Sequence, residues 1–158
     1  MNKTSKNILV MLEMAKLFAM PLQDLGDVVL IGAGYDERER ALLQDAVAYE
    51  SYVNHLHLED ILRIHREVSP KERDLIFQIG YMLLQAWSYR LLPILRGRAI
   101  LAYLGGVSTT SLRFHVERPG QSNWLDISDQ VFLQKENMTV FRITDKGIEK
   151  VAGSRSAA

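Results

Sequence analysis

Cysteine is absent from this chain of 158 residues. Its absence excludes a disulfide framework, a thiolate metal site and a cysteine nucleophile, and it fits a reducing compartment. No uncharged run approaches the roughly 18 residues that a membrane span needs. The apolar stretch near the N-terminus carries Glu13 and Lys16, which is unlike a signal peptide. We therefore predict a cytoplasmic protein that does not associate with membranes.

Motifs of catalysis and cofactor binding are also missing. The sequence has no Gly-x-Ser-x-Gly elbow, no Walker loop and no deaminase zinc signature. Gly32 and Gly34 follow an apolar run, as in a dinucleotide fingerprint, but Glu37 stands where the third glycine belongs. We expect no catalytic residue and no cofactor, and hence a protein that is not an enzyme.

The histidines are few, and three of the four lie close together in the sequence, at His55, His57 and His65. Glu59 and Asp60 lie between them, so a metal site deserves consideration. On a helix, however, pairs at these spacings point in different directions, and no His-Glu-x-x-His pattern is present. We predict no metal site.

Net charge is zero, but the charges are unevenly distributed. Residues 21–62 hold nine acidic and two basic residues, a net of −7, whereas residues 63–98 hold seven basic and three acidic ones, a net of +4. A cationic surface beside an acidic one suits an anionic partner such as nucleic acid. Alternatively, the two parts pair with each other within the fold or across a dimer.

The N-terminal part, residues 1–95, has the patterns of helices. Apolar spacing predicts a helix from Asn7 to Met20, before Pro21. Two capping patterns predict further helices, one opened by Asp36 with Glu39 and one opened by Ser69 with Pro70 and Glu72. The first of these would carry an apolar stripe from Leu42 to Leu56, and in the second Gly80 would mark a close helix crossing. Pro93 should kink or end the last helix.

Residues 96–152 contain a distinctive order of segments. The apolar run Ala99–Leu104 meets Gly105-Gly106, followed by Val107–Val116, two alternating runs and Thr144-Asp145-Lys146-Gly147. This order resembles a winged helix-turn-helix domain. The resemblance implies an α+β fold in which a helical N-terminal part precedes a winged-helix-like C-terminal part with a β-hairpin wing. Ala99–Leu104 would be the first helix of the pair, Thr109–Arg118 the recognition helix, residues 124–134 the outgoing strand, 135–138 the wing tip, and Thr144 the cap of a closing helix.

The resemblance implies binding of double-stranded DNA through the recognition helix. Thr109, Thr110 and Arg113 would read bases, with Ser108 capping the helix. The basic residues that would contact the phosphate backbone are Arg96, Arg98, Arg118 and Lys135. We thus predict a non-catalytic DNA-binding protein, a dimeric transcriptional regulator whose first helix and Leu42–Leu56 stripe supply the dimer contacts.

A different reading stays open, because Leu112–Glu117 alternates with period two, as a strand does. The C-terminal part would then be an antiparallel β-meander. The function would be a protein–protein interaction module: an adaptor, an immunity-type inhibitor or a subunit of a larger assembly. A third alternative is a small-molecule sensor with a pocket lined by Tyr81, Trp87 and Tyr89. Residues 153–158 are expected to form a disordered tail.

Overall fold

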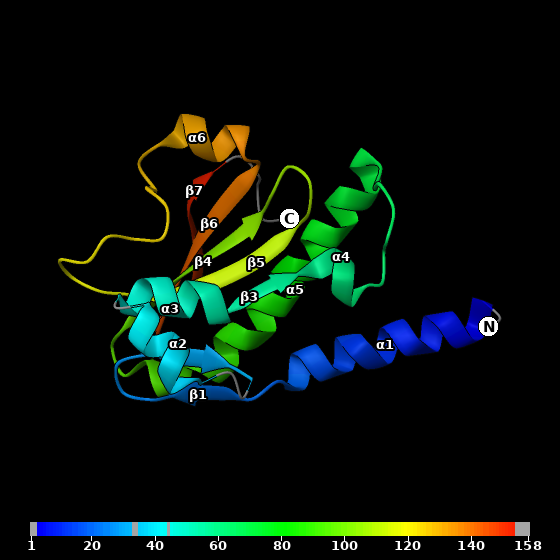
Figure 1. The fold of residues 1–158 in the computed structure, drawn as a ribbon. Coiled ribbons are helices and arrows are strands. Elements are labelled where there is room, and N and C mark those ends of the chain that lie inside the picture. Colours follow the sequence, from blue (N-terminus) through cyan, green and yellow to red (C-terminus); the bar gives the residue numbers. More distant parts are fainter. Residues whose placement is uncertain (1–2, 33–34, 44, 154–158) are drawn as a thin grey trace.

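The computed structural model describes residues 3–32, 35–43 and 45–153, with side chains from residue 10 onward. The chain forms an α+β structure in which a long helix packs against a five-stranded antiparallel sheet (Figure 1). The elements in order are α1 (Lys3–Ala19), β1 (Leu22–Asp24), β2 (Val29–Ile31), α2 (Glu37–Leu42), α3 (Ala46–Val53), β3 (His55–His57), α4 (Leu58–Ile61), α5 (Pro70–Leu95), β4 (Ala99–Gly105), β5 (Ser111–Glu117), α6 (Gln130–Lys135), β6 (Met138–Thr144) and β7 (Gly147–Gly153).

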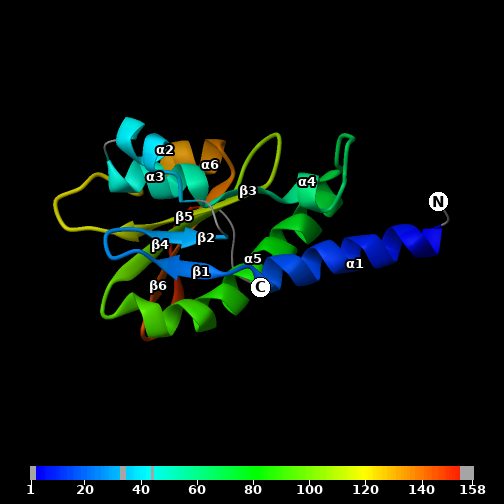
Figure 2. The same cartoon turned by 60° about the horizontal axis from the view of Figure 1, so that its bottom comes forward.

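The large sheet has the strand order β3-β5-β4-β6-β7, and all neighbours are antiparallel. The connected pairs β4–β5 and β6–β7 are hairpins, and the segment between β5 and β6 carries α6. Strands β1 and β2 form a separate hairpin. Helix α5 covers one face of the large sheet, while α6 lies on the other side (Figures 1 and 2). The sheet is therefore covered on both faces.

Helix α5 begins as the sequence predicts. The Ser69 hydroxyl accepts a hydrogen bond from the Glu72 N–H, the Glu72 carboxylate accepts one from the Ser69 N–H, and Pro70 occupies the first turn. The helix continues through Pro93 to Leu95, further than a helix stopped by that proline would. The buried face of α5 includes Trp87, which contacts the Phe114 ring of β5 edge to face. This packing forms the main core.

Gly80 brings α5 close to its neighbours. An added Cβ would lie 2.6 Å from a Leu104 methyl carbon of β4 and 2.7 Å from a Leu58 methyl carbon of α4. At this glycine α5 thus passes close to helix α4, as predicted, and strand β4 of the sheet approaches α5 equally closely. A larger residue would require both leucine side chains to shift.

Two of the other N-terminal predictions are confirmed and one is wrong. Helix α1 ends at Ala19, and Asp36 caps α2 by accepting hydrogen bonds from the N–H groups of residues 38 and 39. The continuous stripe from Leu42 to Leu56 does not form. Asp45 caps a new helix through the Val47 N–H, Leu42 is 81% exposed, and Leu56 belongs to β3. Local capping at Asp45 outweighs the helical spacing of the apolar residues.

The winged-helix layout is also wrong for the described residues. Ala99–Leu104 lies in strand β4, the predicted recognition helix is replaced by a turn and β5, and a turn and β7 stand where the closing helix was expected. Residues 124–129 form a loop, and α6 follows where the outgoing strand was predicted. The cause is the alternation in β5, which places Leu112, Phe114 and Val116 in the core under α5. A helix would have kept Leu112 and Val116 on one face and turned Phe114 to the opposite side.

Candidate functional site

The residues predicted to bind DNA are divided between opposite ends of the β4–β5 hairpin. Arg98 and Arg118 flank the pair Ala99–Glu117 at one end, whereas residues 108–110 form the turn beyond the pair Gly105–Ser111 at the other. The seven residues of each strand separate the two ends by roughly 20 Å. The structure therefore does not bring these residues together on one surface.

The Arg98 guanidinium holds the end of α5 to the β1–β2 hairpin. It donates to the carbonyl oxygens of Leu95 (3.1 Å), Ile94 (2.7 Å) and Gly26 (2.9 Å) and to the Asp24 carboxylate (2.6 Å). Although burial opposes it, the pKa of Asp24 is held below its usual value by the Gly26 N–H and by Arg98. Arg98 is a clamp between two elements. Arg96, by contrast, is exposed at the left-handed C-cap of α5.

Arg118 is likewise bonded to groups within the fold. Its guanidinium donates to the Glu50 carboxylate at 2.6 Å, to the Val116 carbonyl at 3.0 Å and, at short range, to the Asp27 carbonyl. Glu50 is fully buried. Burial raises the pKa of Glu50, although Arg118 and two backbone N–H groups oppose this effect. Arg118 thus neutralises an internal carboxylate.

Helix α3 and its C-cap residue Asn54 hold β2 and β5 together through two side chains. Glu50 accepts hydrogen bonds from the N–H of Val29 in β2 (2.6 Å) and of Val116 in β5 (2.9 Å). The Asn54 side chain bonds the β2 backbone through the Ile31 N–H and the Val29 carbonyl, and donates to the Phe114 carbonyl of β5 at 3.2 Å. The two side chains therefore satisfy backbone groups that a further strand would otherwise satisfy.

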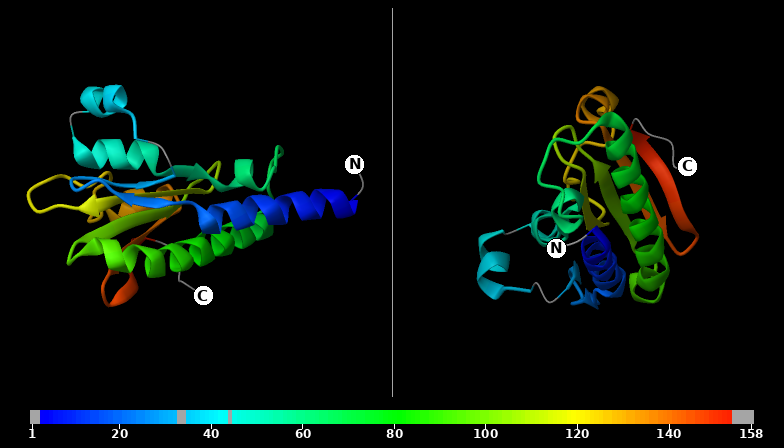
Figure 3. Two further views of the ribbon diagram at one scale, coloured as in Figure 1. Left: turned by 90° about the horizontal axis from the view of Figure 1, so that it is seen from below. Right: turned by 90° about the vertical axis from the view of Figure 1, so that its right-hand side faces the viewer.

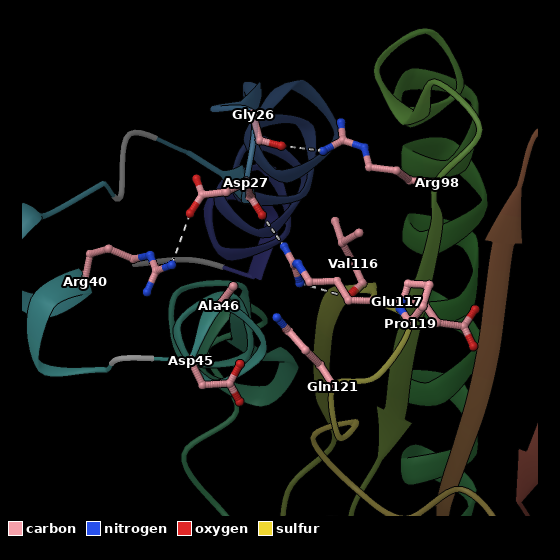
Figure 4. A pocket seen from close by; sticks show the side chains of 11 residues that line it. Gly26, Asp27, Arg40, Asp45, Ala46, Arg98, Val116, Glu117, Pro119 and Gln121 are labelled. Carbon is pink, nitrogen blue, oxygen red and sulfur yellow. Dashed lines mark hydrogen bonds and ion pairs between the residues drawn. The ribbon is translucent and has the colours of Figure 1, made fainter.

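A cavity of about 440 Å³ lies beside these clamps (Figure 4). In addition to Arg98 and Arg118, its wall contains Arg40, whose guanidinium contacts the Asp27 carboxylate at 3.0 Å. All three arginines thus have carboxylate partners, and Asp45 and Glu117 add further acid to the wall. These charges compensate one another, so the cavity does not have the excess of positive charge that a phosphate-binding site needs. Its wall consists of Gly26, Asp27, Arg40, Asp45, Ala46, Arg98, Val116, Glu117, Arg118, Pro119 and Gln121.

Arg113 belongs to a cluster of aromatic and polar side chains on the sheet face opposite α5. Its guanidinium carbon lies 4.0 Å from the ring centre of Trp124, and Nη2 lies 2.7 Å from Nδ1 of His55. Burial lowers the pKa of Arg113, and burial together with the Arg113 charge lowers the pKa of His55 to about 4. The Arg113 Nε atom is buried without a hydrogen-bond partner. This guanidinium is held against the sheet and is not presented to a DNA groove.

The same cluster extends to Tyr103 and His115, which sequence reasoning missed. The Tyr103 hydroxyl lies 3.0 Å from Nε2 of His115, and the Trp124 ring packs edge to face on the Tyr103 ring. Alternation in the two strands could have placed Tyr103, Arg113 and His115 on one face. The position of Trp124, in an irregular loop, has no periodic signal that would have revealed it.

The remaining predicted contacts have varied surroundings. Thr110 is buried, and its N–H donates to both carboxylate oxygens of Glu59 at 2.8 Å. Ser108 and Thr109 are exposed in the turn, and Lys135 is exposed at the end of α6. The turn is thus fixed at Thr110 and solvated at the two residues before it.

The residues proposed for a sensor pocket do not converge. Trp87 is buried and donates from its indole to the Leu17 carbonyl at 3.1 Å, while Tyr81 packs on Phe141. Tyr89 is 75% exposed on the outer face of α5. These aromatic residues therefore line no common cavity.

Comparison with protein-family models, with curated proteins and with solved structures gives no match. In the described part of the chain, no three histidine or acidic residues are grouped as metal ligands would be. Within that same part, every helix is too short or too polar to cross a bilayer.

Proposed function

We propose that the protein is a non-catalytic protein–protein interaction module that pairs with a second copy of itself through the outer face of α5. One observation carries this proposal. Leu75, Met82 and Tyr89 follow one another at seven-residue intervals on that face and are 57%, 59% and 75% exposed. Gln78 and Gln85 lie between them on the same stripe. A solvated helix face ordinarily carries charged residues here, and this one has none from Leu75 to Tyr89.

The spacing suits pairing between identical helices. Side chains repeated every seven residues lie along one line of a helix and can interdigitate with the same line on another helix. In an antiparallel pair centred on Met82, the Leu75 side chain of one copy would approach Tyr89 of the other. Two-fold pairing of this kind is the commonest form of protein assembly. The stripe from Leu75 to Tyr89 has no charged residue, so pairing would not remove water from a charged group.

The test is the oligomeric state of the full chain, measured by sedimentation equilibrium. We expect a dimer at micromolar concentration and a monomer for Met82→Glu, because the substitution buries two carboxylates in the contact. Leu42→Glu is the matched control, since Leu42 is 81% exposed on α2, away from the stripe. A wild type that stays monomeric at about 100 µM, or a Leu42→Glu variant that dissociates equally, contradicts the proposal.

DNA binding, the other function predicted from the sequence, stays a prediction. Its expected recognition helix is a turn and strand β5, and Arg98, Arg113 and Arg118 are bonded within the fold. Interaction between proteins therefore has the better support. A gel shift at low salt with micromolar protein tests DNA binding directly.

A further inference from the structure

One segment of the chain lies across the sheet face opposite α5. Residues 118–129, here called the strap, connect β5 to α6 and form the yellow loop in Figure 1. Trp124, Leu125 and Ile127 of the strap pack on a buried apolar cluster that includes Leu101 and Val140. The strap therefore covers apolar surface that would face solvent if it moved away.

The strap is held by hydrogen bonds at the buried residues His115 and Tyr103. The His115 Nδ1 atom lies 2.9 Å from the Val116 carbonyl, which can only accept, so Nδ1 carries the proton. The single lone pair of His115 Nε2 is then shared between two donors, the Tyr103 hydroxyl at 3.0 Å and the Trp124 N–H at 3.4 Å. The Leu125 backbone also bonds Tyr103. This arrangement requires the neutral imidazole.

A second proton on His115 does not fit this arrangement. It would lie on Nε2 and point at the Trp124 N–H, which cannot accept a hydrogen bond. The Tyr103 hydroxyl could turn to accept it, but the bond from the Trp124 N–H of the strap would still be lost. His115 is fully buried, so water does not reach the imidazolium in place of the lost partner.

The charged groups around His115 come from three elements. Arg118, at the start of the strap, disfavours a second positive charge, while Asp45, which caps α3, and Glu117 of β5 favour it. Burial is the largest influence, and the net effect is a pKa of His115 below its usual value of 6.5. On β4, the facing titratable group is Tyr103, whose pKa is raised by burial and which stays neutral in this range.

We propose that protonation of His115 releases the strap and uncovers the apolar sheet face beneath it. An exposed histidine titrates near pH 6.5, so the open form takes up the proton more readily than the closed form. The closed form of the strap therefore has its full stability relative to the open form above pH 6.5, and it loses this stability as the pH falls below 6.5. This device is independent of the pairing proposed for α5, which involves the other side of the sheet.

The test uses the emission of Trp124 in a Trp87→Phe background, because the chain has only two tryptophans. Between pH 7.5 and pH 5 we expect a shift of emission to longer wavelength with a midpoint below 6.5, while far-UV circular dichroism stays unchanged. The shift should be absent in His115→Gln. It should persist in His57→Gln, a matched control at an exposed histidine.

Hydrogen exchange keeps the test decisive if a variant fails to fold. In the wild type, the protection of the Trp124 and Leu125 amides should fall at least tenfold as the pH falls through the same midpoint, after correction for intrinsic rates. Protection in β4 and β6 should remain. The proposal is overturned if Trp124 stays protected to pH 5, if its emission shift survives in His115→Gln, or if all amides lose protection together.

Discussion

Glu50 lies on α3 and Asn54 is the C-cap residue of that helix, about one turn further on, and each bonds the backbones of both β2 and β5. The β1–β2 hairpin is thereby tied to the large sheet by side chains instead of by strand pairing. Two polar side chains at spacing i, i+4 can do this because they project from the same helix face. The stability of the N-terminal part should therefore depend strongly on this pair.

Replacing Glu50 with alanine should destabilise the fold by about 3–5 kcal/mol, because it leaves the Arg118 charge without its carboxylate partner and two buried N–H groups without an acceptor. Urea unfolding of the variant measures the loss. Glu37→Ala is a suitable control, since Glu37 is exposed in the first turn of α2. An effect of Glu50→Ala no larger than that of the control would contradict the role given to α3.

Arg98→Ala should cost about 1–3 kcal/mol, because the carbonyl groups at the end of α5 and the Asp24 carboxylate lose a charged donor. Arg96→Ala should change stability by less than about 0.5 kcal/mol, since Arg96 is exposed. Both arginines were predicted to contact DNA phosphates. Equal loss of DNA affinity in the two variants, with folding intact, would support the DNA-binding prediction.

Gly105→Ala should prevent stable folding or cost several kcal/mol. Gly105 has a φ of +136°, and an added Cβ would lie 2.1 Å from the Asn137 carbonyl oxygen, where β4 meets β6. Gly120→Ala provides the control, because its φ is also positive (+77°) but nothing lies within 4 Å of the added carbon. The control should cost only the backbone strain, roughly 1–2 kcal/mol. Thermal unfolding of both variants separates the clash from the strain.

The capping carboxylate of α5 gives a prediction about pH. Hydrogen bonds from Arg66, and from the backbone and hydroxyl of Ser69, lower the pKa of Glu72 to about 2. Because the folded pKa is below the unfolded value, the stabilisation is present above pH 4.5 and is lost as the pH falls toward 2. NMR titration of the side-chain carboxyl should give that midpoint, and Ser69→Ala should move it upward. A midpoint near 4.5 in the wild type would show that the capping box does not hold Glu72.

The sequence predicts the structure best where the signal is local. The Ser69 cap with Pro70, the Asp36 cap and the end of α1 depend on contacts within a few residues, and the structure confirms them. The class α+β is also confirmed. The two caps are hydrogen bonds between groups only two or three residues apart, so the local sequence specifies them.

Prediction failed where distant contacts decide the structure. The run Ala99–Leu104 is apolar throughout and fits a buried helix or a buried strand equally well. It becomes β4 because β5 and β6 pair with it on both sides. The same limit applies to the candidate site, since nothing near Trp124 in the sequence indicates that it covers Arg113 and Tyr103.

The hydrogen bonds from Glu50 and Asn54 to β2 and β5 also restrict how this chain can change over evolutionary time. One residue inserted or deleted between Glu50 and Asn54 would rotate one of the two side chains by about 100° around the helix and leave it facing away from the strands. Point substitutions elsewhere on α3 leave the Glu50 and Asn54 side chains aligned with each other. Homologous chains should therefore keep the length of this interval unchanged, even where their loops differ in length.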